Sequence, residues 1–199
     1  MIFGLVLGLL SGLSACLPEP LPDAEWVAAE DISGPLALDL DLNSRNAQPG
    51  SRLRVVTFNV LYGDDLPALV AAIRGNSELA AADVFLIQEI ESYPDEGESR
   101  SATLARELDM NYAYAPAREE GTGTHGLAIL SRFALDRVEV MRLPRFEMRY
   151  NSRDRIALAA DILLGEEALR VVDVHLDTRL NITQRVIQLN PAVTRSDER

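Results

Sequence analysis

The 199-residue sequence contains no lysine, so all 19 of its basic residues are arginines, against 31 acidic residues. The net charge of −12 argues against tight nonspecific nucleic-acid binding, which depends on basic surfaces that release counterions from phosphates. The single cysteine, Cys16, excludes an intrachain disulfide and a zinc site built from several cysteines. Hydrophobic residues nevertheless make up 47% of the chain, which predicts a real core.

The N-terminal apolar run, residues 1–13, has no basic residue before it and is too short to span a bilayer as a mature helix. It ends in Leu-Ser-Ala-Cys16, which resembles the cleavage box of bacterial lipoproteins. The resemblance implies a signal peptide at residues 1–16, with Cys16 as the lipidated mature N-terminus that anchors the protein in a membrane of the bacterial cell envelope. Leu17 after the cysteine implies outer-membrane retention in a double-membrane bacterium. The alternative is a short core strand with a buried free cysteine.

Residues 17–50 are rich in Pro, Asp and Ala. This composition predicts a tether between the membrane and a domain at residues 51–199. Within the segment, residues 36–42 alternate between apolar and polar types, and this pattern is compatible with an edge strand.

From residue 53 onward the pattern is that of a globular domain. Apolar runs predict strands, and Pro67 marks the first turn of a helix, while Pro191 ends or kinks a later one. The predicted strands are 53–60, 84–90 and 112–115, the predicted hairpins pair 127–130 with 134–141 and 156–164 with 168–176, and the predicted helices are 67–73, 103–108 and one beginning at 183–189. These elements predict an α+β layered fold.

Three of the apolar strands deliver a chemically useful side chain at or near their C-terminal ends: Asn59, Glu89 and His175. A polar group at the end of a buried strand costs free energy unless a cation, a hydrogen-bond partner or a substrate satisfies it. Two oxygen ligands from adjacent strands suit Mg²⁺. His175 titrates near neutrality, so it can stabilise or protonate a developing oxyanion.

The order of these segments resembles the endonuclease/exonuclease/phosphatase superfamily, which includes deoxyribonuclease-like and sphingomyelinase-like enzymes. Four motifs carry the resemblance over roughly residues 52–189. They are Thr-Phe-Asn59, Gln-Glu89, Gly-Leu-Ala-Ile-Leu-Ser-Arg132 and His175-Leu.

The resemblance implies a four-layer α/β-sandwich and hydrolysis of a phosphodiester or phosphomonoester of unspecified class. It implies Mg²⁺, with Mn²⁺ as a substitute, held by Glu89 and Asn59. His175 would be the catalytic residue and Arg155 would bind the substrate phosphate, with Arg153 as the alternative match.

Four further residues lie near these motifs. We expect Asp173 to orient the imidazole of His175, and Asp177 to share its face of the strand. His125, in a Gly/Thr-rich stretch, is predicted to be a solvated loop residue. Leu127 stands where the family has an asparagine, which removes one polar contact.

Two family segments, Gly-Asp-x-Asn and a terminal Ser-Asp-His, have no match in this sequence. Their absence predicts a partial sandwich, incomplete at its C-terminus, in which hydrolysis is impaired. The alternative is a catalytically inactive envelope lipoprotein that keeps the scaffold.

Overall fold

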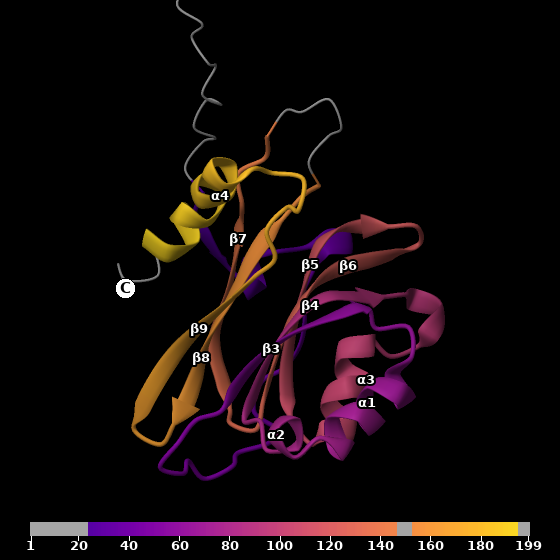
Figure 1. Ribbon diagram of the computed structural model, residues 1–199, viewed down its shortest axis with the longest axis vertical. Coiled ribbons are helices and arrows are strands. Elements are labelled where there is room, and N and C mark those ends of the chain that lie inside the picture. The colour runs from indigo at the N-terminus through magenta and orange to yellow at the C-terminus, as the bar shows by residue number, and fades with distance from the viewer. Residues whose placement is uncertain (1–23, 147–152, 195–199) are drawn as a thin grey trace, which may run out of the picture.

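A computed structural model describes residues 24–146 and 153–194 of the chain. It is an α+β fold in which two β-sheets pack face to face, with helices on their outer faces (Figure 1). The four-stranded sheet contains, in spatial order, β1 (Trp26–Ala28), β7 (Leu135–Arg142), β8 (Ile156–Leu164) and β9 (Glu167–Val174). The five-stranded sheet contains, in spatial order, β2 (Asp39–Asp41), β5 (Asn111–Glu120), β6 (Gly123–Ser131), β4 (Val84–Ser92) and β3 (Val55–Tyr62).

The main core lies between the two sheets and is filled by alternate residues of their strands. On β8, Leu158 and Ala160 point into this core, whereas Ala157 and Ala159 belong to a second cluster on the outer face. All four are fully buried, so β8 is covered on both faces. This explains why residues 156–164 read as an almost continuous apolar run.

Three helices cover the outer face of the five-stranded sheet (Figure 1). They are α1 (Leu66–Gly75), α2 (Ser77–Ala80) and α3 (Arg100–Leu108). The side chain of Asp65 accepts a hydrogen bond from the backbone of Ala68 at the start of α1, and Ser99 caps α3 in the same way through Ala102. Such caps satisfy backbone donors that the helix itself leaves free.

The last helix, α4 (Ile182–Thr194), lies against the outer face of the four-stranded sheet, where its Ala192 packs with Trp26 and Met141. Pro191 lies inside this helix and does not end it. Proline removes one backbone hydrogen bond, but burial of Ala192 one residue later holds the final turn on the sheet. In the described residues no helix is long and apolar enough to cross a membrane.

The N-terminal segment from residue 24 to residue 50 contributes to both sheets, so the folded domain begins before the predicted boundary at residue 51. Strand β1 pairs with β7, and β2 pairs with β5 as the edge of the five-stranded sheet. Between them lie the short 3-10 helices η1 (Ala29–Asp31) and η2 (Gly34–Leu36); a third, η3 (Pro94–Glu96), precedes α3. Trp26 is 7% exposed, which shows that this segment adds to the core.

One predicted hairpin is wrong and the other is confirmed. Strands β6 and β7, expected to pair with each other, lie in different sheets, and β6 pairs instead with β5 and β4. The chain crosses between the sheets at residues 132–134, and this short connection resembles a hairpin turn in the sequence. Strands β8 and β9 pair along their whole length, as predicted.

Candidate active site

Glu89 lies at a bulge in β4 that changes the direction of its side chain. The preceding residues alternate, with Phe85 and Ile87 facing the helices and Val84 facing the other sheet. Pairing with both neighbouring strands shifts register here, and Glu89 has a φ of 61°. Ile90 then returns to the helix-facing cluster. The extra residue removes Glu89 from the alternation, at a cost of about 1–3 kcal/mol for a non-glycine residue in this conformation.

Asn59 lies on the adjacent parallel strand, β3, and its Cα is paired in register with that of Gln88. Its side-chain oxygen accepts a hydrogen bond from the backbone N–H of Leu61 at 3.0 Å. Leu61 and Tyr62 both have positive φ, so β3 is also distorted at this point. The two predicted metal ligands therefore belong to neighbouring strands that are irregular at the same level of the sheet.

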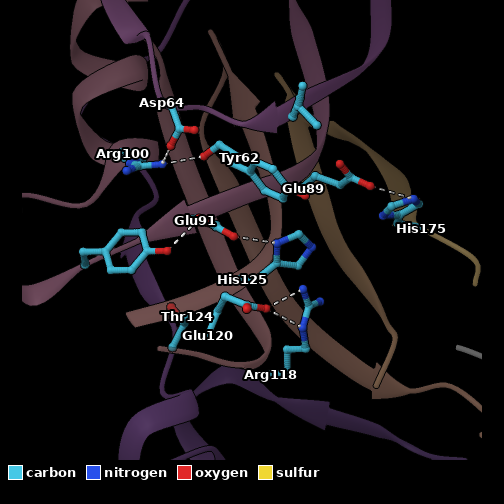
Figure 2. Close-up of polar contacts among 12 residues, drawn as sticks. Tyr62, Asp64, Glu89, Glu91, Arg100, Arg118, Glu120, Thr124, His125 and His175 are labelled. Atoms are coloured by element: carbon cyan, nitrogen blue, oxygen red, sulfur yellow. Dashed lines mark hydrogen bonds and ion pairs between the residues drawn. The ribbon is translucent and has the colours of Figure 1, made fainter. Parts of the chain in front are cut away.

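His175 follows β9 and lies between a carboxylate and a guanidinium. Its Nε2 is 3.5 Å from Oε1 of Glu89, and its Nδ1 is 2.9 Å from Nη1 of Arg155. Figure 2 shows the side chains of His175 and Glu89 pointing toward one another. A guanidinium can only donate, so Nδ1 of the imidazole accepts and the proton of the neutral ring lies on Nε2, facing Glu89. The structure thus joins residues from the two sheets that the sequence predicted to act together.

The electrostatic environment favours this neutral imidazole. Burial lowers the pKa of His175, and the positive charge of Arg155 lowers it further, whereas Glu89 acts in the opposite direction. The side chains of His175 and Glu89 are only partly covered, with 15% and 22% of their surface exposed. The pair can therefore be reached by a substrate without local unfolding.

Arg155, at the start of β8, is buried and keeps an unused donor. It is 8% exposed, and burial lowers its pKa. Within the described part of the chain its Nε has no hydrogen-bond partner. It lines a narrow pocket with His175 and His125. A buried N–H without a partner is costly, and a hydrogen-bond acceptor that reached Nε would satisfy it.

Asp173 does not contact His175 in the way that the sequence suggested. Its Oδ1 accepts a hydrogen bond from Nε2 of Gln88 at 2.6 Å, and Gln88 also donates to Thr57 at 3.1 Å. These bonds connect β9 to β4 and β3 across the space between the sheets. Asp173 therefore fixes the position of the strand from which His175 projects.

Asp177 does not lie on β9, which ends at Val174. It is buried and accepts hydrogen bonds from the backbone N–H groups of Arg153 and Arg179. Its role is to join the segment before β8 to the loop after β9. By holding the backbone at Arg153, it helps to present Arg155, two residues later, toward His175.

A search against protein-family models matches residues 56–190 to the endonuclease/exonuclease/phosphatase family. The chain belongs to this family. A solved structure of an endonuclease/exonuclease/phosphatase family protein from Leptotrichia buccalis C-1013-b has a TM-score of 0.55 and 15% sequence identity. The match covers 72% of this chain and 63% of that protein, and at this identity it supports the fold alone. No curated protein matches the chain significantly.

The oxygen atoms of Glu89 and Asn59 can be compared with the ligands that a divalent metal needs. Glu89 supplies a carboxylate and Asn59 an amide, which are hard oxygen ligands of the kind that Mg²⁺ prefers, and Mg²⁺ typically keeps several waters. Glu89 is partly exposed. Among the described residues no group of three or more His, Cys, Asp or Glu side chains is arranged to hold a metal. The residues present therefore fit a weakly held Mg²⁺ with mostly water ligands.

The prediction for His125 is wrong, because this residue is buried in β6 and not solvated in a loop. It is 3% exposed, its Nδ1 is 3.3 Å from Oε1 of Glu91, and its ring lies 6.1 Å from that of Tyr62. Burial and the charge of Arg118 lower its pKa to about 4. The sequence gives little sign of this, because Gly123 and Gly126 on either side of Thr124 and His125 are a composition typical of a turn.

Tyr62 and the loop after β3 are held by Arg100 of α3 (Figure 2). The guanidinium donates to the carbonyl oxygen of Tyr62 at 2.9 Å and to the carboxylate of Asp64 at 2.7 Å. It also stacks over the ring of Tyr93 at 5.1 Å. This clamp supports the distorted end of β3, beside Asn59.

Cys16, the predicted lipidation site, lies outside the described residues.

Proposed function

We propose that this family member is a Mg²⁺-dependent phosphoesterase that hydrolyses a phosphodiester or phosphomonoester bond. The observation that supports this most strongly is that Arg155, which is buried and has an unpartnered Nε among the described residues, bonds His175 and lines a small pocket with it. A guanidinium is well suited to bind phosphate oxygens through two N–H groups.

Each side chain of the site has a role that its contacts suggest. Arg155 binds and orients the phosphate. The neutral imidazole of His175, with its proton on Nε2, donates to the oxygen on which charge develops. Oε1 of Glu89 lies 3.5 Å from that Nε2 in the resting site, and together with Asn59 the carboxylate would hold the metal. A bound Mg²⁺ supplies charge neutralisation on the phosphoryl oxygens and makes bound water more acidic.

The test is hydrolysis of bis(p-nitrophenyl) phosphate by the purified full chain with and without Mg²⁺, and with Mn²⁺ as a substitute. We expect Glu89→Ala and His175→Asn to lower turnover by about 10²-fold or more, as loss of a charge-stabilising group typically does. Glu78→Gln is the matched control, because Glu78 is an exposed carboxylate on α2. Turnover that is unaffected by Glu89→Ala and by chelation would contradict the proposal.

Complete absence of turnover in all proteins would favour the second candidate, an inactive envelope lipoprotein that keeps the scaffold. The observation behind this candidate is that one carboxylate and one amide hold Mg²⁺ weakly. A direct measurement of metal binding by calorimetry separates the two: weak but measurable binding that Glu89→Ala removes supports the enzyme.

The partner and location follow from the sequence and stay proposals. The net charge of −12 favours a compact phosphoester over a long nucleic acid bound nonspecifically. Lipidation of Cys16 would anchor the protein in the bacterial cell envelope, with the outer membrane as its place in a double-membrane bacterium. Mass spectrometry of the membrane fraction tests this: an unmodified Met1 at the N-terminus would contradict it.

A further inference from the structure

A large cavity lies beside the site, where the N-terminal segment crosses from one sheet to the other. Its volume is about 610 Å³, which is within the usual range of small-molecule sites, roughly 300–1,000 Å³. The segment between β1 and β2, drawn in indigo in Figure 1, forms one wall, and β7 and the start of β8 form the other. Most of the lining is apolar and includes Val27, Ile32, Leu36, Leu38, Val140 and Ile156.

Arg155 connects this cavity to the site. It lines the apolar cavity, and it also lines the narrow pocket that contains His175 and His125. The residue is more than nine-tenths buried, and its Nε has no partner among the described residues. A ligand with an anionic oxygen bound to the guanidinium of Arg155 therefore has an apolar chamber on one side of that residue.

The acidic residues of the cavity wall are Glu25, Asp31 and Asp154, and among the described residues none of them forms an ion pair with Arg155; Glu25 and Asp31 are exposed. The side chain of Arg145 is paired with Asp154 at 3.0 Å, and both Arg142 and Arg145 are exposed. The deeper wall consists of Val140, Leu143 and Ile156, which are all buried. The cavity is thus apolar in its interior and charged near solvent, as expected for a site that accepts an apolar group with a polar end.

We propose that the cavity binds an alkyl chain of the substrate, so that the preferred substrate is a phosphate ester with an apolar ester group, held by its phosphate at Arg155. This inference rests on the proposed phosphoesterase function and deepens it. Burial of each methylene in an apolar site favours binding by roughly threefold or more. A short chain would fill only part of the cavity, so the gain should rise with chain length and then level off.

The experiment compares p-nitrophenyl alkyl phosphates that share one leaving group and differ in the alkyl chain: methyl, butyl and octyl. The full chain is assayed below the concentration at which the esters form micelles. We expect kcat/KM to rise at least tenfold from methyl to octyl, chiefly through KM. Leu36→Trp, which fills the cavity, should abolish this rise and leave the rate with the methyl ester unchanged. Ala37→Trp is the matched control, because Ala37 is the exposed neighbour of Leu36 and does not line the cavity.

A binding measurement separates failure of this inference from failure of the proposed function. Calorimetry with octyl phosphate and methyl phosphate needs no turnover, and we expect octyl phosphate to bind at least tenfold more tightly to the wild-type chain. If the protein has no phosphoesterase activity but binds octyl phosphate selectively, and Leu36→Trp removes this selectivity, the proposed function is wrong and the alkyl-binding role of the cavity is supported. Mg²⁺-dependent turnover without any preference for alkyl length would contradict the alkyl-binding role of the cavity and support the proposed function.

Two further outcomes are decisive for the cavity. If octyl phosphate binds more tightly than methyl phosphate, but equally well to Leu36→Trp and to the wild type, its alkyl group does not lie in the cavity and the inference is wrong. If circular dichroism shows that Leu36→Trp does not fold, Leu36→Phe is used in its place, and a preference shifted to a shorter chain supports the inference. An unchanged preference in folded Leu36→Phe contradicts it.

Discussion

His175 lies between Arg155 and Glu89, and the two neighbours act on it in opposite ways. Arg155 donates to Nδ1, which fixes the position of the ring proton, and Glu89 lies at Nε2. Because a histidine alone would rotate and exchange its proton freely, this pair of contacts gives the imidazole one orientation. In the proposed reaction Arg155 would therefore act on both the phosphate and the histidine.

Arg155→Lys is expected to reduce kcat/KM for bis(p-nitrophenyl) phosphate by about 100-fold, because one ammonium group cannot bond both His175 and a phosphate as a planar guanidinium does. Arg153→Lys is the control. Arg153 was the alternative match in the sequence, and only its backbone N–H bonds Asp177, so its replacement should change the rate by less than about twofold. Steady-state kinetics of the two variants decides which arginine binds the phosphate. Equal losses of kcat/KM in Arg155→Lys and Arg153→Lys would contradict the assignment to Arg155.

Asp173 should make the stability of the protein depend on pH. Burial raises its pKa to about 7, although Gln88 donates a hydrogen bond to it. In the unfolded chain an aspartate has a pKa of about 3.9. Between about pH 4 and pH 7 the folded state therefore binds more protons than the unfolded state, and the free energy of unfolding falls as pH rises, by up to about 1.4 kcal/mol per pH unit.

Replacement of Asp173 by Asn tests this effect. Asn cannot ionise, so Asp173→Asn should have a higher melting temperature than the wild type at pH 8, and the difference should shrink toward pH 4. The measurement is thermal unfolding by circular dichroism at one-unit pH intervals. Parallel curves for the two proteins would show that Asp173 does not titrate in this range.

At the scale of the elements, irregular strand ends place the site. Strand β4 loses its alternation at Glu89, and β3 loses its own between Asn59 and Tyr62. Regular strands would have sent Glu89 toward the helix-facing core, where an unpaired carboxylate is costly. The bulge instead turns Glu89 away from that core, and its Oε1 lies 3.5 Å from Nε2 of His175.

The close approach of β5 and β6 near the site requires a glycine at position 126. A Cβ atom there would collide with the carbonyl oxygen of Ala115. Gly126→Ala should therefore destabilise the protein by about 2 kcal/mol or more, because two backbones must separate. In the control, Gly75→Ala, the added methyl meets nothing within 4 Å at the end of α1. Urea unfolding measures both, and equal stability of the two variants would contradict the prediction.

At the scale of the whole molecule, the segment before residue 51 is part of the domain. Trp26 packs on Met141 and Ala192 in the outer cluster, and Leu38 and Leu40 pack on the core between the sheets. The segment also forms one wall of the apolar cavity. Its loss would expose the edge strands β7 and β5 together with apolar surface.

Two deletions test this organisation. Removal of residues 1–23 should leave a soluble protein with a cooperative unfolding transition. Removal of residues 1–50 should destabilise it by several kcal/mol, since loss of a buried tryptophan alone costs about 3–5 kcal/mol, and the shortened protein should aggregate. The comparison is made by size-exclusion chromatography and thermal unfolding; similar behaviour of both deletions would support the tether that the composition of residues 17–50 suggested.

The sequence by itself determined the strands that end near Asn59, Glu89 and His175, the α+β class, the β8–β9 hairpin and the family. These features follow from local patterns, since a buried strand needs a run of apolar residues and a hairpin needs only its own turn. The motif order was also sufficient for the family, which the match over residues 56–190 confirms.

Only the tertiary structure decided which strands pair, which residues of the N-terminal segment fold, and what surrounds each polar side chain. The short link between β6 and β7 crosses between sheets: β6 pairs with β5 and β4, whereas β7 pairs with β1 and β8. Asp173 bonds Gln88, 85 positions away, and the burial of His125 depends on partners from other strands. Such contacts join segments that are distant in the chain, and a local pattern holds no information about a partner that lies outside it.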